Sequence, residues 1–162
     1  QQSCTLDYFL QFFNGKSFPA NLWIGVTAEN QARADERIPV LMQIPAKHRF
    51  VSVEPMLGPV DLTEIRNPHH ESGACYTNVL YGKEFHEDDH KCSESEKLDW
   101  VICGAETGPG ARTMSSVDAI RLRNSCKDAG VPFFFKKVTK GNVLPDELKV
   151  REFPDFWEAR GK

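Results

Sequence analysis

Three glutamates share one feature: each is the first charged residue after a short apolar run. They are Glu29, Glu54 and Glu106. If the runs are neighbouring parallel strands, their carboxyl ends meet at one edge of a sheet, and we expect the three carboxylates to converge there. Converging carboxylates bind cations or the hydroxyl and amino groups of a ligand. Their mutual repulsion would raise the pKa of at least one of them, which could then act as an acid or base. The alternative is a set of ordinary salt bridges that close the end of a barrel.

Three more polar residues belong to the same candidate site: Asn30, Arg112 and Lys136. Asn30 directly follows Glu29, and Lys136 ends the last apolar run. An arginine or lysine at such an edge can hold the carboxylate or phosphate of a ligand. We therefore expect both signs of charge in the site.

A glycine-rich stretch surrounds Glu106. Its glycines, Gly104, Gly108 and Gly110, have the spacing G-x-x-x-G-x-G. Such a loop lets backbone amides approach an anion or an adenosine, assisted by a helix that we expect to begin near Ser115. The spacing is neither the dinucleotide-binding fingerprint nor a phosphate-binding loop, because no Gly-Lys-Ser/Thr follows. A simple tight turn explains it equally well.

Residues 67–97 show no apolar periodicity, and we expect them to form a polar inserted loop between the second and third strands. Four residues in it are candidate zinc ligands: Cys75, His86, His90 and Cys92. The two histidines would share one face of a helical turn, and two thiolates would complete a tetrahedral site. A bound metal would give shape to a segment without a core. The alternative is an acidic, histidine-containing loop without metal, because no C-x-x-C pair is present.

The apolar runs alternate with stretches of helical periodicity. The expected strands are 22–26, 49–53, 100–103 and 132–136, and the expected helices are 5–13, 31–44 and 115–129. Within the second helix, Pro39 must stop, kink or restart the helical turn. We interpret residues 142–162, which are rich in apolar side chains, as an arm that covers an edge or end of the sheet.

This alternation predicts an α/β fold with parallel strands, βα repeats, right-handed crossovers and helices outside the sheet. Four such strands are half of an eight-stranded TIM-like (β/α) barrel, for which about 250 residues are typical. The chain has 162 residues. We therefore expect one α/β domain over residues 1–162, forming either a small open sheet or the carboxyl-terminal half of a partial barrel.

The composition is that of a globular protein, with 40% hydrophobic residues and a formal net charge of −3. This charge excludes a globally basic nucleic-acid-binding protein, although basic residues concentrate in the last third. No apolar run reaches about 18 residues, so we expect no membrane span. Five cysteines without close pairs fit a reducing compartment, and we expect a cytoplasmic protein.

Five blocks of the sequence resemble, in this order, a phage-associated family of uncharacterised proteins related to the radical S-adenosylmethionine barrel enzymes. The blocks are 21–30 (NLWIGVTAEN), 33–39 (RADERIP), 50–60 (FVSVEPMLGPV), 99–112 (DWVICGAETGPGAR) and 131–136 (VPFFFK). The resemblance covers residues 21–66 and 98–137 and corresponds to the later half of such proteins. It implies a radical-SAM-like barrel in which the following residues face the cofactor or substrate side: Glu29, Glu54, Gly104, Glu106 and Arg112.

The resemblance also implies S-adenosylmethionine as a cofactor. Members of the family carry a cysteine cluster near the start of the barrel, the expected ligands of an iron–sulfur cluster. Here Cys4 stands alone before the first resembling block. The chain by itself is therefore not expected to cleave S-adenosylmethionine reductively, and a missing upstream part would have to supply the cysteines.

Two functions stay open at this point. The first is the carboxyl-terminal half of a radical-SAM-like barrel, completed by a missing amino-terminal half or partner chain. It would provide part of the cofactor and substrate surface of a modifying enzyme, with nucleic acid as a candidate substrate. The second is a non-catalytic module that binds a partner or a second copy through open sheet edges and holds zinc in its insertion.

Overall fold

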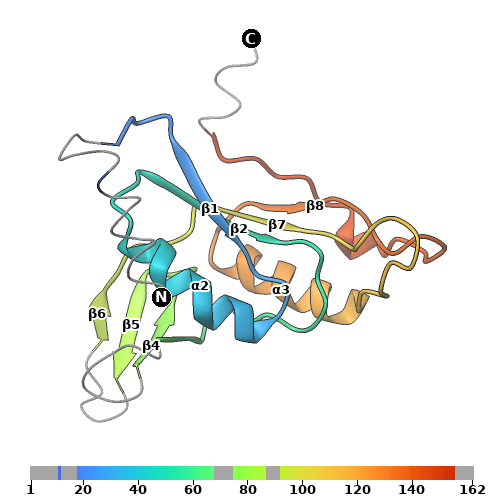
Figure 1. The fold of residues 1–162 in the computed structure, drawn as a ribbon, viewed down its shortest axis with the longest axis horizontal. Coiled ribbons are helices and arrows are strands. Elements are labelled where there is room, and N and C mark those ends of the chain that lie inside the picture. The colour runs from blue at the N-terminus through green and yellow to red at the C-terminus, as the bar shows by residue number, and fades with distance from the viewer. Residues whose placement is uncertain (1–10, 12–17, 68–74, 87–91, 156–162) are drawn as a thin grey trace.

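The computed structural model describes residues 11, 18–67, 75–86 and 92–155 (Figure 1). They form a parallel sheet, two helices that cover one of its faces, and a second, antiparallel sheet. The parallel sheet has the order β1 (Trp23–Thr27), β2 (His48–Val53), β7 (Trp100–Cys103) and β8 (Phe133–Phe135). All four predicted strands and their parallel pairing are confirmed. The expected helix at 5–13 lies outside the described residues, apart from Gln11.

Two helices connect the parallel strands. They are α2 (Gln31–Gln43), which follows β1, and α3 (Ser116–Asp128), which joins β7 to β8. The side chain of Asn30 caps α2 by accepting a hydrogen bond from the backbone N–H of Arg33 at 3.1 Å. Ser115 caps α3 in the same way, with the N–H of Asp118 at 3.3 Å. α2 continues through Pro39 rather than stopping there. No helix among the described residues is long and apolar enough to cross a membrane.

Side-chain alternation along the strands gives the parallel sheet two different faces. The face toward the helices is buried and carries Val51, Val53, Val101, Cys103, Phe133 and Phe135. These residues belong to one core with the apolar sides of both helices: Ala34, Ile38, Leu41, Ala119, Leu122 and Cys126. The opposite face carries a row of rings that stay partly exposed: Trp23, His48, Phe50, Trp100 and Phe134. Among the described residues, the sheet therefore has one face covered by the two helices and an opposite face without a helix, which we call the open face. Part of this open face is in contact with the carboxyl-terminal arm, because Phe153 packs against Trp100 and Phe134.

A second sheet occupies the stretch that we expected to be an irregular loop, and that prediction is wrong for the described residues. Its antiparallel strands are, in order, β3 (Ile65–Asn67), β4 (Cys75–Asn78), β5 (Lys83–His86) and β6 (Cys92–Glu94). Strands this short show no clear alternating pattern in a sequence. Ile65, Val79 and Leu80 are buried and belong to the same core as the parallel sheet. The insertion is thus attached to the main core.

A carboxyl-terminal arm follows β8 and returns along its free edge. The backbone N–H of Phe135 donates to the carbonyl of Val150 at 2.9 Å, and the N–H of Glu152 donates to the carbonyl of Phe133 at 3.0 Å. The described part of the arm, which ends at Asp155, therefore covers an edge of the sheet as the sequence predicts.

Arg49, at the start of β2, is the only charged residue that is buried among the described part of the chain. Its Nη2 donates to the carbonyl of Ile44 at 2.6 Å, and its Nη1 donates to the carboxylate of Glu96 at 3.1 Å. Its backbone N–H donates to the carboxylate of Asp99 at 2.8 Å. Arg49 thereby joins the end of α2, the start of β2 and the segment that returns from the second sheet.

Replacing Arg49 should destabilise the fold more than removing its ionic partner does. Arg49→Met loses a charge-assisted hydrogen bond to a buried carbonyl, for which we expect a cost of about 1–3 kcal/mol. Glu96→Gln removes the ion pair alone, and because the Glu96 side chain is 64% exposed, the expected cost is below about 1 kcal/mol. Urea unfolding followed by circular dichroism measures both. Equal losses in the two variants would contradict the dominance of the backbone contact.

Candidate functional site

The ends of the parallel strands bring four predicted site residues into one row on the open face of the sheet. Register pairing aligns Thr27, Ser52, Ile102 and Phe134. Two residues further along each strand, the next positions of this face are Glu29, Glu54, Gly104 and Lys136. The N–H of Gly104 donates to the carbonyl of Val53 at 3.2 Å. The N–H of Lys136 donates to the carbonyl of Cys103 at 2.8 Å, so the backbone pairing extends to this row.

Glu54 and Lys136 form an ion pair across Gly104. The Lys136 Nζ lies 2.8 Å from Glu54 Oε2, and both side chains keep contact with solvent. A Cβ atom on Gly104 would lie 3.2 Å from Glu54 Oε1 and 3.2 Å from the Cβ of Lys136, closer than side chains normally approach. The missing side chain therefore allows residues from β2 and β8 to meet over the end of β7.

Glu106 and Arg112, at the two ends of the glycine-rich loop, are hydrogen-bonded to each other. The carboxylate of Glu106 accepts hydrogen bonds from the backbone N–H of Arg112 at 2.8 Å, from its Nε at 2.9 Å and from its Nη2 at 2.6 Å. Between them, Gly108 and Gly110 have φ angles of 108° and 75°, which favour glycine. The loop is a turn fixed by a bidentate charge pair.

The pairing with Arg112 shifts the pKa of Glu106 in the direction opposite to the one that repulsion between carboxylates would give. The hydrogen bonds from the guanidinium and the backbone of Arg112 lower the pKa of the Glu106 carboxyl to about 2. Glu106 is therefore ionised at neutral pH and does not serve as a general acid. Glu106 is therefore not the carboxylate whose pKa repulsion would raise, because the guanidinium of Arg112 is hydrogen-bonded to it.

Glu29 has a cationic partner that the sequence pattern did not indicate. Arg37 of α2 donates from Nη1 to Glu29 Oε2 at 3.0 Å and to the carbonyl of Thr27 at 2.7 Å. The charge of Glu29 also contributes to the raised pKa of Arg112, so these groups lie in one electrostatic neighbourhood. Asn30, the fourth polar candidate, is engaged as the helix cap. Arg37 was missed because its distance from Glu29 depends on how α2 packs beside β1.

The segment that follows β2 is hydrogen-bonded to the residues just after β1 and β7. The N–H of Met56 donates to the carbonyl of Gly104 at 2.9 Å, and the N–H of Leu57 donates to the carbonyl of Glu29 at 2.7 Å. These two bonds fix the spacing between the ends of β1, β2 and β7. The site is therefore built on strand ends joined by backbone hydrogen bonds, and each strand-end glutamate has its own cation.

This arrangement can bind a ligand that carries both a positively and a negatively charged group. Each of the three glutamates is neutralised by one basic side chain, and the alternative of salt bridges at the strand ends describes these contacts well. A partly exposed carboxylate beside a partly exposed ammonium also matches the ammonium and carboxylate of an amino acid, which can exchange partners with the pair. Behind the pair, burial and the charge of Glu54 raise the pKa of the Cys103 thiol to about 12, so this thiol is not a nucleophile.

The four candidate zinc ligands are only partly described. His90 lies outside the described residues, and the register pairs Cys75 with His86 and Phe85 with Cys92. The thiol of Cys75 donates to the carboxylate of Glu84 at 3.1 Å, and burial raises its pKa to about 12. Within the described part of the chain, no group of three or more histidine, cysteine or acidic residues has the geometry of a metal site.

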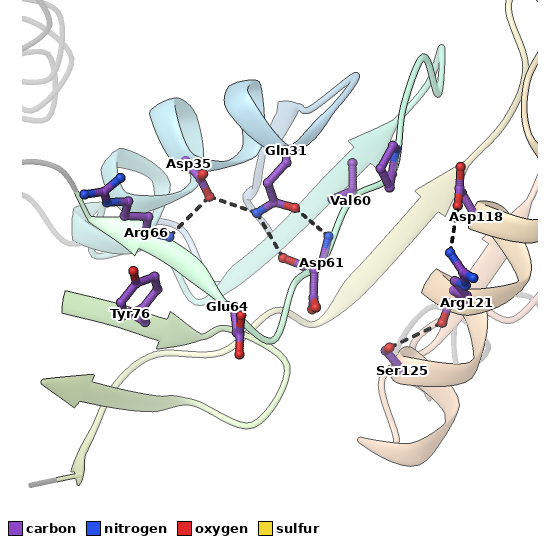
Figure 2. Close-up of a pocket in the computed structure, with 11 residues that line it drawn as sticks. Gln31, Asp35, Val60, Asp61, Glu64, Arg66, Tyr76, Asp118, Arg121 and Ser125 are labelled. Atoms are coloured by element: carbon purple, nitrogen blue, oxygen red, sulfur yellow. Dashed lines mark hydrogen bonds and ion pairs between the residues drawn. The ribbon is translucent and has the colours of Figure 1, made fainter. Parts of the chain in front are cut away.

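A pocket of about 460 Å³ lies on the helix side of the parallel sheet. Figure 2 shows it between α2 and the second sheet on one side and α3 on the other. Its polar lining consists of Gln31, Asp35, Asp61, Glu64, Arg66, Tyr76, Asp118, Arg121 and Ser125. Sequence reasoning did not find this pocket because its walls come from separate segments, one of which is the unexpected second sheet.

Comparison with known protein families gives one match, which covers most of the chain. Residues 3–152 match a family described as a protein of unknown function (DUF5131). The chain belongs to this family. Searches of curated proteins and of solved structures found no match. For this DUF5131 protein, function is therefore inferred from the arrangement of its own side chains.

The pair between Glu106 and Arg112 predicts a titration that can be measured directly. In Arg112→Met, the pKa of Glu106 should rise from about 2 toward its ordinary value of 4.5. Because the folded pKa is the lower one, the pair stabilises the fold above pH 4.5, and this contribution disappears as the pH falls toward 2. Carboxyl-detected nuclear magnetic resonance follows the titration of Glu106.

Arg121→Met is the matched control, because it removes an exposed arginine whose carboxylate partner is Asp118. This control should leave the titration of Glu106 unchanged. An unaltered Glu106 titration in Arg112→Met would show that the pair does not form in solution.

Proposed function

We propose that this chain is the carboxyl-terminal half of a radical-SAM-like partial barrel and that its strand-end row binds part of S-adenosylmethionine. The observation that carries the proposal is the ion pair of Glu54 and Lys136, which sits at the carboxyl ends of parallel strands on the open face. Ligands of parallel α/β folds bind at this end of the strands. The resemblance of the sequence to radical-SAM-related proteins supports the same position.

The residues present fit the amino-acid end of S-adenosylmethionine. Glu54 would accept hydrogen bonds from the ligand's ammonium, while Lys136 would donate to its carboxylate, so the charges in the bound state remain balanced. The loop fixed by Glu106 and Arg112 borders the same edge and would offer backbone groups to the adenosine. When bound, S-adenosylmethionine would supply a reactive carbon–sulfur bond at its sulfonium centre.

The described cysteines do not fit an iron–sulfur cluster. Cys75, Cys103 and Cys126 are buried on separate elements, and burial raises the pKa of each thiol. A cluster ligand must be an accessible thiolate. In this proposal, the cysteines that bind the cluster would come from an additional amino-terminal half or from a partner chain.

The sheet has one edge at which such a half would add. The strand order follows the chain order, so a preceding βα unit would lie beside β1. At the other edge, the arm pairs with β8 through an antiparallel bridge between Phe134 and Arg151. Addition at β1 would extend the open aromatic face into the interior of a partial barrel. Exposed lysines after β8, Lys137 and Lys140, make nucleic acid the substrate class that we favour.

Titration calorimetry with S-adenosylmethionine tests the ligand directly. We expect one saturable site on the chain. Glu54→Gln and Lys136→Met should each weaken binding about tenfold or more, because each removes a charged hydrogen bond to the ligand. The matched controls are Glu147→Gln and Lys149→Met, which change the same residue types on an exposed turn after β8 and should bind as the parent does.

Absence of binding heat from a chain whose circular dichroism shows it folded would overturn the proposed ligand. If the site variants and the control variants weaken S-adenosylmethionine binding equally, the loss comes from the change in net charge and not from the strand-end row.

A zinc-binding module is the second candidate function, and one observation favours it. The antiparallel register places Cys75 directly opposite His86, so two of the four candidate ligands belong to one cross-strand pair. Zinc would have to displace the hydrogen bond from Cys75 to Glu84 and the thiol proton. Elemental analysis of the purified chain should then find one zinc per chain, lost in His90→Ala and retained in His48→Ala. If the chain is produced in medium that contains zinc and is still purified without metal, this candidate function is contradicted.

A further inference from the structure

The pocket of Figure 2 is an open groove with an excess of negative charge. Its ionisable lining consists of the acids Asp35, Asp61, Glu64 and Asp118 and the bases Arg66 and Arg121. Arg121 is paired with Asp118 at 3.4 Å on α3. The guanidinium of Arg66 turns away from Asp61 and Glu64 in Figure 2. The side of the groove formed by α2, the segment before β3 and the second sheet therefore presents mainly carboxylates.

These carboxylates have neutral hydrogen-bond partners. Asp35 accepts from the amide of Gln31 at 2.9 Å and from the backbone N–H of Arg66 at 3.2 Å. Asp61 accepts from the N–H of Thr63 at 2.8 Å and from its hydroxyl at 2.6 Å. Neutral donors orient a carboxylate without cancelling its charge. For Glu64, the described residues provide no hydrogen-bond or ion-pair partner. Three carboxylates of this wall thus have no ion-pair partner among the described residues, and two of them are held in place by hydrogen bonds.

Aromatic side chains extend the groove onto the surface of the second sheet. Tyr76 of β4 lines the pocket, and the register pairs it with Phe85 of β5, whose side chain is 40% exposed. Pro59 and Val60 add apolar surface between α2 and α3. Aromatic faces beside carboxylates bind ammonium and guanidinium groups, and they pack against the methylene stems of lysine and arginine.

We propose that this groove docks an extended, lysine- and arginine-containing segment of a partner protein. Charge complementarity selects a cationic partner, because three carboxylates without basic partners line one wall. The apolar and aromatic surface suits cations that carry aliphatic stems. The row from Tyr76 to the exposed Phe85 continues beyond the pocket, which favours a chain with several side chains over a single small cation. This docking surface shares no lining residue with the strand-end row, and its charge does not depend on a ligand bound there.

A binding experiment with the full 162-residue chain tests this surface. The probe is a synthetic peptide of about twelve residues that alternates lysine and alanine, with blocked ends and a fluorescent label, measured by anisotropy. Asp61→Asn combined with Glu64→Gln should weaken binding about tenfold. Tyr76→Ala should weaken it by a similar factor through loss of the ring. The matched control, Asp146→Asn combined with Glu147→Gln, makes the same change in net charge on an exposed turn and should bind as the parent does.

Four outcomes would overturn the proposal, provided that each variant keeps the circular dichroism spectrum of the parent. The first is the absence of peptide binding by the parent chain, and the second is equal weakening by the control pair. The third is binding of spermine as tight as that of the peptide and insensitive to Tyr76→Ala, which would make the occupant a small polyamine. The fourth is preferential binding of a single-stranded oligonucleotide that is weakened by Tyr76→Ala.

Discussion

Parallel pairing of four strands, with both connecting helices on one side, is the constraint on which the rest of this protein depends. The pairing directs every strand end to the same edge, so residues far apart in sequence become neighbours. It also divides the side chains of each strand between a covered face and an open one. Buried aliphatic and aromatic residues hold the helices, while the open face carries rings and, beyond them, the charged row.

The charged row illustrates how a backbone decides the electrostatics of a site. Gly104 removes one side chain at the centre of the row, and Glu54 and Lys136 meet across the space it leaves. Glu106 is bound by Arg112 within its own loop. The site thus combines three carboxylates with three basic side chains, each glutamate paired with its own cation.

The second sheet adds a different kind of surface to the same core. It takes the place where a helix would normally cross from β2 to β7, and a groove remains between this sheet and α3 (Figure 2). Arg49 links the returning segment to the start of β2, so the position of the second sheet is tied to the parallel sheet. The two surfaces that we propose to be functional thus share no lining residue and differ in net charge. One lies at the strand ends with balanced charge, and the other lies in the helix layer with excess negative charge.

The sequence by itself determined the four parallel strands, the two described helices, the start of α3 near Ser115 and the strand-end placement of the glutamates. Those features follow from local patterns, because apolar runs, capping residues and glycines act within a few positions of the chain. Only the tertiary structure decided which cation binds which glutamate, that Asn30 is engaged as a cap, and that the insertion forms a sheet bordering a groove. Arg37 reaches Glu29 through the packing of α2 beside β1. The groove exists because separate segments meet in space. Partner choice between side chains depends on distances set by packing and register, and a linear pattern of residue types does not contain those distances.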